Sequence, residues 1–430
     1  MNAPPSIAWC IQKPTYLSGS EWYRAHRPVS VMAQKEGWLS FLATHFLPPE
    51  KSGEPWRVLI PIEGTEHVVT PQVIVMRPIF ALDGMDTTSY DSAAKITEAI
   101  AYAQESGQIF LADLDDHPYA WNAEYIGRIG GEPITDWSWH DDWLRQANAV
   151  LCSTKALIEV LAPRFDDQTF AYAPNLYDPF RYEVTAKFER TIGSHLFPNA
   201  RYLTDFQILG EAVKPFLESH PLWTFRHVGE EFRCVNCSHP KTRHFEPDEA
   251  PRHGGLSYCA ECACEIYVKP VGDGQLATYS GIPQDRISAR ESVGLFDLPK
   301  AMDWSIGIVP LADNEWNRCK TDGKGFEMAA AGIPFCFVGG HPLYAKAPSL
   351  RLDNLPEDEA TYRRASKNFR AWAEQVAQEH ERDYRAALVD LSRHDLSRKR
   401  PLRQIDATGG HPKKIGSHFD GWDTLATMPT

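Results

Sequence analysis

The succession of a strand, a polar loop and a helix start at 304–334 constrains the fold more than any other part of this sequence. The apolar run 304–311 predicts a buried strand. After a polar loop, Thr321 or Asp322 marks the start of a helix and Gly332 marks its end. This order of elements is typical of α/β proteins, in which ligands collect where a loop leaves a strand.

The start of this helix is predicted to bind an anion. Free backbone N–H groups and the helix dipole give a helix N-terminus a partial positive charge. Gly323 and Gly325 let a ligand approach the backbone, and Lys320 and Lys324 add full positive charges. A diphosphate fits this arrangement.

Glu327 lies one turn into the same helix, where its charge would repel a phosphate. Its carboxylate suits a diol such as ribose, which offers two hydroxyl donors. The lysines and the glutamate together predict a nucleoside diphosphate that spans both. The alternative is a lysine-flanked surface helix on which Glu327 is only solvated.

The stretch resembles the donor site of family-4-like glycosyltransferases of the GT-B fold, P-L-x-D-x-x-x-N-x-x-K-[ST]-D-x-K-x-x-E-x-A-A-A-G-I-P. The resemblance implies that Glu327 binds the ribose of a nucleotide sugar and that the loop before it holds the diphosphate. Many family members have a second glutamate eight positions earlier, which contacts the donor sugar, and Cys319 stands there in this chain. The donor-site candidates in this stretch are Asn317, Lys320, Lys324 and Glu327.

Length and composition indicate a globular chain of two domains. The chain has 430 residues, 43% hydrophobic and 23% charged. A formal charge of −13 argues against wholesale wrapping of nucleic acid, although a local basic groove remains compatible with it. The N-terminus lacks a signal-peptide pattern, and no window approaches about 18 apolar residues. We expect a soluble protein without membrane insertion, located in the cytoplasm, or in the host cytoplasm if phage-encoded.

Short apolar runs alternate with helical or turn segments in the first part of the chain, including an amphipathic stretch at 92–104. This alternation predicts a parallel sheet covered by helices. The predicted strands of this part are 6–12, 57–62, 72–76, 108–112 and 149–153.

A glycine loop follows the first predicted strand, and it leads into a helix that reaches about Gly37. Its sequence resembles the G-x-x-x-Y-R-x-x-x-P opening of the same glycosyltransferases. The resemblance implies that Gly19 lies on the donor side of the cleft and that Tyr23 and Arg24 lie on its acceptor side. A cation on the helix surface is the alternative for Arg24.

Three acids and a histidine lie where the 108–112 strand ends, at Asp113, Asp115, Asp116 and His117. They could form a Mg²⁺ or Mn²⁺ site, hydrogen-bond the sugar and accept the acceptor's proton, or form a solvated turn. The resemblance favours the second interpretation, because GT-B enzymes usually need no metal for chemistry. It implies Asp115, Asp116 and His117 as the catalytic candidates.

His195 ends the strand that opens the second half of the chain. The resemblance implies a contact with the donor phosphates or the cleft at this position. A loop histidine without a special role is the alternative.

Two Cys-x-x-Cys knuckles in the second half predict a structural Zn²⁺ site with a closed thiolate shell. The predicted ligands are Cys234, Cys237, Cys259 and Cys262, and Cys264 or His244 could replace one of them. The ribbon either braces the domain or binds the acceptor or a partner, including nucleic acid.

The pattern divides the chain into two Rossmann-like domains, an insertion, a helix and a tail. A long helix with one apolar stripe follows the second domain, and the resemblance implies that it crosses back onto the first. The predicted ranges are 1–180 for the acceptor-side domain, 181–356 for the nucleotide-sugar domain, 230–268 for the zinc ribbon, 357–392 for the helix and 393–430 for a flexible tail.

The resemblance implies an α/β protein of the GT-B fold that moves a sugar from a nucleotide-diphosphate sugar to a hydroxyl acceptor, with retention and without a catalytic metal. The acceptor could be a glycan or small metabolite, a protein, or a hydroxymethylated DNA base as in phage-type modification enzymes. A non-catalytic zinc-ribbon binding protein on a degenerate GT-B scaffold and a nucleotide-sugar epimerase are the alternatives.

Overall fold

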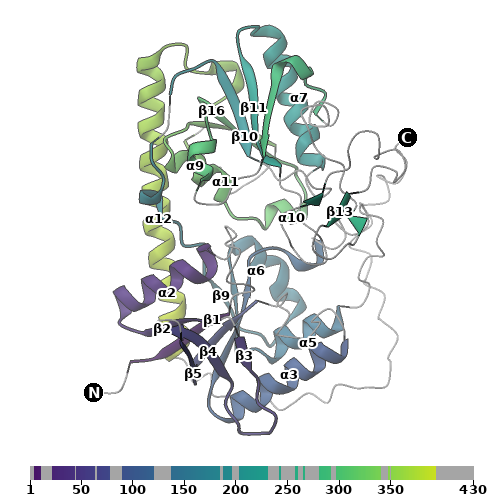
Figure 1. Ribbon diagram of the computed structural model, residues 1–430, viewed down its shortest axis with the longest axis vertical. Coiled ribbons are helices and arrows are strands. Elements are labelled where there is room, and N and C mark those ends of the chain that lie inside the picture. The colour runs from purple at the N-terminus through teal and green to yellow at the C-terminus, as the bar shows by residue number, and fades with distance from the viewer. Residues whose placement is uncertain are drawn as a thin grey trace.

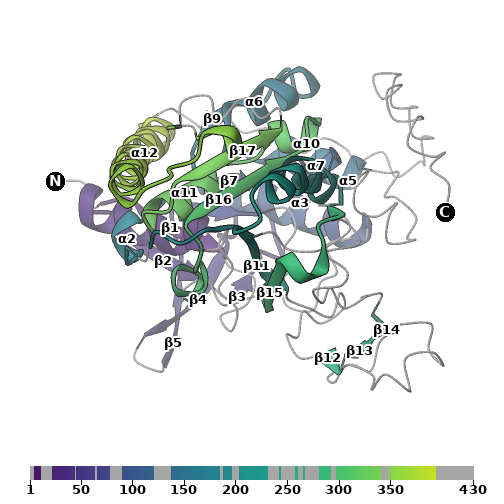
Figure 2. The same cartoon turned by 90° about the horizontal axis from the view of Figure 1, so that it is seen from above.

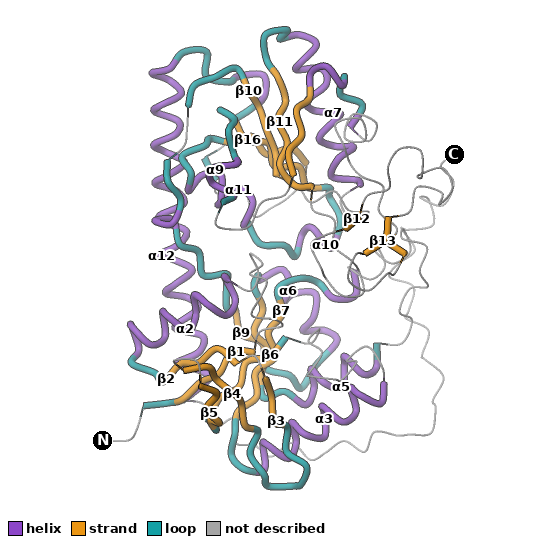
Figure 3. Tube along the Cα trace, in the orientation of Figure 1, coloured by secondary structure: helices purple, strands orange, loops and turns teal. Residues whose placement is uncertain are grey.

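Two parallel sheets form the framework of the chain (Figures 1 and 3). The computed structural model describes residues 4–10, 22–43, 45–62, 65–77, 90–120, 137–184, 187–195, 203–230, 242–243, 257–259, 265–266, 280–291, 297–339, 347–348 and 350–393.

The first sheet has six strands in the order β2-β1-β6-β7-β8-β9, and every pairing in it is parallel. Strand β7 reads IFLADL and is buried over five of its six positions, because helices cover both faces of such a sheet. The strands are β1 (Ser6–Cys10), β2 (Leu39–Ala43), β6 (Val73–Met76), β7 (Ile109–Leu114), β8 (Ala149–Cys152) and β9 (Phe170–Tyr172).

Local sequence signals mark one helix start and one helix end in this part. The Thr154 hydroxyl caps α6 by accepting a bond from the backbone N–H of Leu157 at 3.1 Å. Gly37 ends the first helical segment with φ 68°. The helices are η1 (Trp22–His26), α2 (Arg27–Val31), η2 (Met32–Glu36), α3 (Tyr90–Glu105), α5 (Ser138–Gln146) and α6 (Lys155–Leu161).

The prediction that 57–62 joins the parallel sheet is wrong. This run is β4 (Arg57–Ile62), the middle strand of a separate antiparallel sheet with β3 (His45–Leu47) and β5 (Thr65–Val69). Ile62 pairs with Thr65, so β4 and β5 form a hairpin, a connection too short for parallel strands. An apolar run has the same appearance in either sheet, and here it buries Val58 against the core of the first domain.

The second sheet has five parallel strands in the order β15-β11-β10-β16-β17. The chain leaves the central strand β10 toward β11 and β15 on one side and then returns to β16 and β17 on the other. The strands are β10 (Thr191–His195), β11 (Thr224–Glu230), β15 (Ile287–Glu291), β16 (Ile306–Leu311) and β17 (Phe335–Gly339), and the helices are α7 (Leu203–Ser219), α9 (Leu298–Ala301), α10 (Glu315–Arg318) and α11 (Gly323–Ala330).

The long helix α12 (Glu359–Arg393) runs past both sheets (Figure 1). Its first half packs Phe369 and Ala373 among apolar residues of the second domain. Its second half packs Tyr384 and Leu388 into the core of the first domain. Among the described helices, none combines the length and the apolar character needed to cross a lipid bilayer.

Three short antiparallel strands, β12 (Thr242–Arg243), β13 (Ser257–Cys259) and β14 (Glu265–Ile266), lie apart from both parallel sheets (Figure 2). Cys259 ends β13, while the other three predicted zinc ligands, Cys234, Cys237 and Cys262, lie outside the described residues. Within the described ranges, no group of three His, Cys, Asp or Glu residues could hold a metal ion.

Candidate functional site

The predicted strand, loop and helix form β16, a loop that contains α10, and α11. Asn314 caps α10 by accepting a 2.7 Å bond from the backbone N–H of Asn317. Gly332 follows α11 at φ 74°, and its N–H and that of Ile333 bond back to the last turn, as in a Schellman C-cap. Because α11 follows the loop that leaves the carboxyl end of β16, its start lies at the carboxyl edge of the second sheet.

The two lysines lie around the start of α11. Lys320 is 9% exposed, and its Nζ lies 3.6 Å from the centre of the Trp316 ring, a cation–π contact. The Nζ atom of Lys324 is also buried. Two buried cations beside a helix N-terminus give this position a concentrated positive potential.

Glu327 is 8% exposed and is hydrogen-bonded through both carboxylate oxygens. Tyr23 donates to Oε1 at 2.8 Å, and Nε2 of His195 lies 2.8 Å from Oε2. Burial and then the charge of Glu327 raise the pKa of Tyr23 well above its usual value, so the phenol keeps its proton. Glu327, His195 and Tyr23, which come from three separate segments, therefore meet at one point.

Asn317 lies beneath this loop rather than on its surface. It is 1% exposed, and its amide nitrogen donates to Asp205 at 2.9 Å and to the backbone oxygen of Ala312 at 3.1 Å. Asp205, on α7, also accepts the backbone N–H of Ala312 at 2.7 Å. These bonds fix the shape of the loop after β16, so the geometry gives Asn317 a supporting role.

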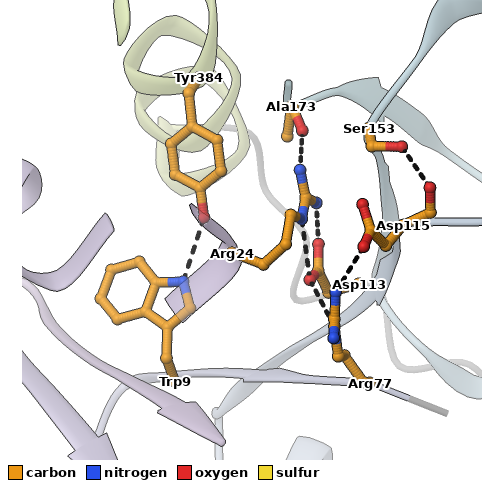
Figure 4. Close-up of polar contacts among 8 residues, drawn as sticks. All are labelled: Trp9, Arg24, Arg77, Asp113, Asp115, Ser153, Ala173 and Tyr384. Carbon is orange, nitrogen blue, oxygen red and sulfur yellow. Dashed lines mark hydrogen bonds and ion pairs between the residues drawn. The ribbon is translucent and has the colours of Figure 1, made fainter. Parts of the chain in front are cut away.

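Arg24 is buried at 1% exposure, so it is not a cation on the helix surface, and its side chain points toward Asp113 (Figure 4). Its guanidinium forms a two-pronged ion pair with Asp113 and also donates to the backbone oxygen of Ala173. Burial is the largest single influence and lowers the pKa of Arg24, but the charge and hydrogen bonds of Asp113, with smaller contributions from Tyr384 and Asp115, together raise it overall. Arg24 thus ties η1 to the ends of β7 and β9.

Asp115 follows β7 and is held in place by two neighbours (Figure 4). Arg77 donates to its carboxylate at 3.1 Å, and the Ser153 hydroxyl donates to its backbone oxygen at 2.7 Å. The Asp115 side chain keeps 16% exposure, and Asp116 is half-buried. Asp115 is therefore an oriented carboxylate at the carboxyl edge of the first sheet.

His117 contacts the second domain. Its Nδ1 accepts the backbone N–H of Ala120 at 3.1 Å, so its Nε2 carries the proton and donates to Glu315 at 3.3 Å. Burial lowers the pKa of His117, and Glu315 partly opposes this. His117 is therefore a neutral imidazole that joins the first domain to α10.

Further hydrogen bonds join the loop before α11 to the first domain. Asn175 donates to the Thr321 hydroxyl at 3.2 Å, and Tyr177 donates to Asp322 at 3.0 Å. Cys319, at the position of the family's second glutamate, is fully buried and packs with the core of the first domain. Cys319 is therefore part of the domain junction.

Among the predicted site residues, Gly19 lies outside the described residues.

The sequence did not single out Tyr177, Tyr182 or Asp205, which support the site from distant segments. Tyr177 lies in the segment 174–178, P-N-L-Y-D, which resembles a P-N-x-x-D segment of the same glycosyltransferases, and this resemblance was a usable signal. Asp205 and Tyr182 carried no comparable signal.

Neither protein-family models nor curated protein sequences match this chain. Solved structures do. "Trehalose-6-phosphate from E. coli bound with UDP-2-fluoro glucose" is similar with a TM-score of 0.50 and 11% identity, over 90% of this chain and 99% of that chain. An alpha,alpha-trehalose-phosphate synthase (UDP-forming) from Burkholderia vietnamiensis has a TM-score of 0.49 and 10% identity, over 90% and 98% of the chains. The pneumococcal O-GlcNAc transferase GtfA, in complex with UDP and GlcNAc, has a TM-score of 0.46 and 10% identity, over 91% and 100%.

The likeness to the E. coli structure extends over nearly the whole of both chains, and at 11% identity it shows the fold alone. The fold is the two-domain α/β architecture known as GT-B.

Proposed function

We propose that this protein is a glycosyltransferase that uses a nucleotide-diphosphate sugar as its donor. One observation carries the proposal: buried Glu327, on the helix that Lys320 and Lys324 flank at its start, meets His195 at the end of the central strand β10. The strand order reverses around β10, and open parallel sheets bind nucleotides outside the carboxyl ends of their strands at such a point.

The chemistry of the residues assigns a role to each. Lys320, Lys324 and the N-terminus of α11 bind the diphosphate and stabilise the charge that grows on it as the bond to the sugar breaks. Glu327 accepts hydrogen bonds from the ribose hydroxyls. Asp115, fixed by Arg77, is the candidate for orienting the sugar or the acceptor hydroxyl. The resemblance to family-4-like enzymes supports retention at the anomeric carbon.

The first test is binding. The E. coli structure contains a UDP sugar, which makes UDP the first nucleotide to try, followed by GDP and ADP. Calorimetry on the full chain should detect one of the diphosphates, and the nucleoside alone should bind far more weakly. If no nucleoside diphosphate binds, or if Glu327→Gln leaves binding and turnover unchanged, the proposal fails.

The second test identifies the acceptor. Sugar-labelled donor is incubated with glycan, protein and hydroxymethylated DNA fractions, and transfer of label identifies the class. Conversion of the donor sugar to an epimer without any acceptor would instead identify an epimerase. Donor binding without any turnover would favour a non-catalytic scaffold.

A zinc ribbon at 230–268 remains a proposal based on the two Cys-x-x-Cys knuckles. Cys259 ends β13, which pairs with both β12 and β14, so the strands supply the kind of short antiparallel frame that knuckles need. A closed thiolate shell would make the metal structural, and we propose no role for it in the chemistry.

A further inference from the structure

The carboxylate of Glu327 is held by both domains. The first domain contributes Tyr23, on η1, and the second contributes His195, at the end of β10. Tyr23 is also 2.8 Å from the hydroxyl of Tyr182, in the segment that connects the domains. Tyr23 and Glu327 are 304 positions apart in the chain, so only the folded arrangement of both domains brings them together.

The direction of these hydrogen bonds follows from proton counting. A phenol has one proton, and Tyr23 donates its proton to Glu327, which as a carboxylate has none to give. Tyr182 must therefore donate to Tyr23 across their 2.8 Å contact. The result is a one-way relay from Tyr182 through Tyr23 to Glu327, and it orients one carboxylate oxygen.

Each carboxylate oxygen accepts about two hydrogen bonds. After bonding to Tyr23 and His195, each oxygen of Glu327 can therefore accept one more. A carboxylate that the protein has already oriented loses less freedom when a diol binds, and this strengthens binding. The two unused acceptor sites match the two donors of a pair of vicinal hydroxyls.

His195 provides a second, independent observation. Its side chain is 10% exposed, and its Nδ1 is buried without a hydrogen-bond partner among the described residues. Because Nε2 is bonded to Glu327, Nδ1 needs a partner from elsewhere. A buried polar nitrogen requires a hydrogen-bond partner, and a hydroxyl of a bound nucleotide sugar supplies one, since a hydroxyl both donates and accepts.

We infer that Tyr23 is a positioning residue for the donor ribose, so that the first domain completes the ribose-binding carboxylate of the second. This inference rests on the proposed function, and it moves Tyr23 from the acceptor side to the donor side. It also predicts that ribose recognition depends on the two domains being in contact.

The test compares each variant's affinity for a diphosphate with and without ribose hydroxyls. The probes are whichever of UDP, GDP or ADP binds the wild type best, and its 2′,3′-dideoxy counterpart. Tyr23→Phe keeps the ring and removes only the hydroxyl. It should weaken binding of the ribose form about tenfold and leave the dideoxy form nearly unchanged, because the lost orientation matters only to a diol.

Tyr177→Phe is the matched control, since it also removes a buried hydroxyl that bonds across the domains, to Asp322 rather than to Glu327. It should change the affinities for both probes by the same factor. His195→Asn, which withdraws the donor at the Nε2 position, should repeat the selective loss, and His195→Gln should restore it in part. Because the Tyr23 and His195 variants probe the same carboxylate independently, the inference can still be tested if one of them folds poorly.

The possible failures are distinguishable. If the wild type binds a diphosphate but Tyr23→Phe weakens both probes equally, or neither, the inference is overturned and the proposed function stands. If the wild type binds none of the diphosphates, both are overturned.

Discussion

The hydroxyl of Thr154, in the first domain, donates a 2.8 Å hydrogen bond to the backbone oxygen of Cys319, in the second. The same hydroxyl caps α6 by accepting from Leu157. One side chain therefore caps the start of a helix and fastens the loop that leads to the candidate donor site. This double use makes Thr154 a direct probe of the domain junction.

Replacing Thr154 with alanine should lower the free energy of unfolding by about 1–3 kcal/mol, through loss of the cap and of a buried hydrogen bond. Urea denaturation measures the change. Thr154→Ser keeps the hydroxyl and should recover most of it. Equal stability of the alanine and serine variants would show that neither bond contributes.

Replacing Lys324 with alanine should weaken binding of a nucleoside diphosphate about 10–100-fold, because a charge-assisted contact to phosphate is lost. Binding of the uncharged nucleoside should be unaffected. The control is Lys35→Ala, which removes the same charge from an exposed position near the end of η2. Calorimetry measures the diphosphate affinity of both variants. A similar loss of affinity in the two would contradict a specific phosphate contact of Lys324.

Replacing Arg24 with methionine should destabilise the protein by about 3–5 kcal/mol, because Asp113 is left as a poorly compensated buried charge. Arg77 lies 3.6 Å from Asp113 and compensates only in part. The double variant Arg24→Met with Asp113→Leu removes both charges and should regain part of the loss. Urea denaturation tests this, and a double variant as unstable as the sum of the single ones would contradict the coupling.

Acid should destabilise the protein through His140. Burial, assisted by the charge of Arg164, lowers the pKa of His140 from 6.5 to about 3. Between these values the unfolded state binds a proton that the folded state does not, so stability falls as pH falls. The expected loss from this residue is about 2 kcal/mol between pH 6.5 and pH 5.

Thermal unfolding at pH 7 and pH 5 measures this dependence. His140→Phe keeps an aromatic ring beside Trp137 and Trp143 but cannot titrate. Its melting temperature should therefore fall less with acid than that of the wild type. An unchanged acid dependence would show that other groups cause it.

The purified protein should contain about one zinc ion per chain if the two knuckles form a closed shell. Cys259→Ser should abolish or strongly reduce the metal content. Cys152→Ser changes a buried cysteine at the end of β8 and should leave the metal content intact. Elemental analysis tests this, and a metal-free wild type prepared without chelators would refute the ribbon.

Strand β16 and helix α11 could be predicted from local patterns. The apolar run at 304–311, the helix start at Thr321 or Asp322 and the helix end at Gly332 lie in one stretch, and the strand, loop and helix appear where these signals predict them. The error at β4 shows the limit of this approach, because sheet membership depends on which strands lie beside a run and not on its own residues.

The candidate site likewise has a part that local sequence predicts and a part that only the fold reveals. Lys320, Lys324 and Glu327 share one short segment, and their chemistry pointed to a nucleoside diphosphate. The supporting contacts of Tyr23 and Asn317 joined residues far apart in the chain, so no local pattern contained them. Arg24 was predicted at the cleft, with a cation on the helix surface as the alternative, and its burial against Asp113 excludes the surface position.

The sequence by itself determined the strand, loop and helix that carry the two lysines and Glu327. An apolar run, the signals for a helix start and end, and the conformational freedom of glycine all depend on residues that are neighbours in the chain. Only the tertiary structure decided that Tyr23 and His195 hold the Glu327 carboxylate and that Cys319 packs into the first domain. Such contacts depend on how the two sheets pack together, and that packing is set by the burial of surfaces assembled from the whole chain.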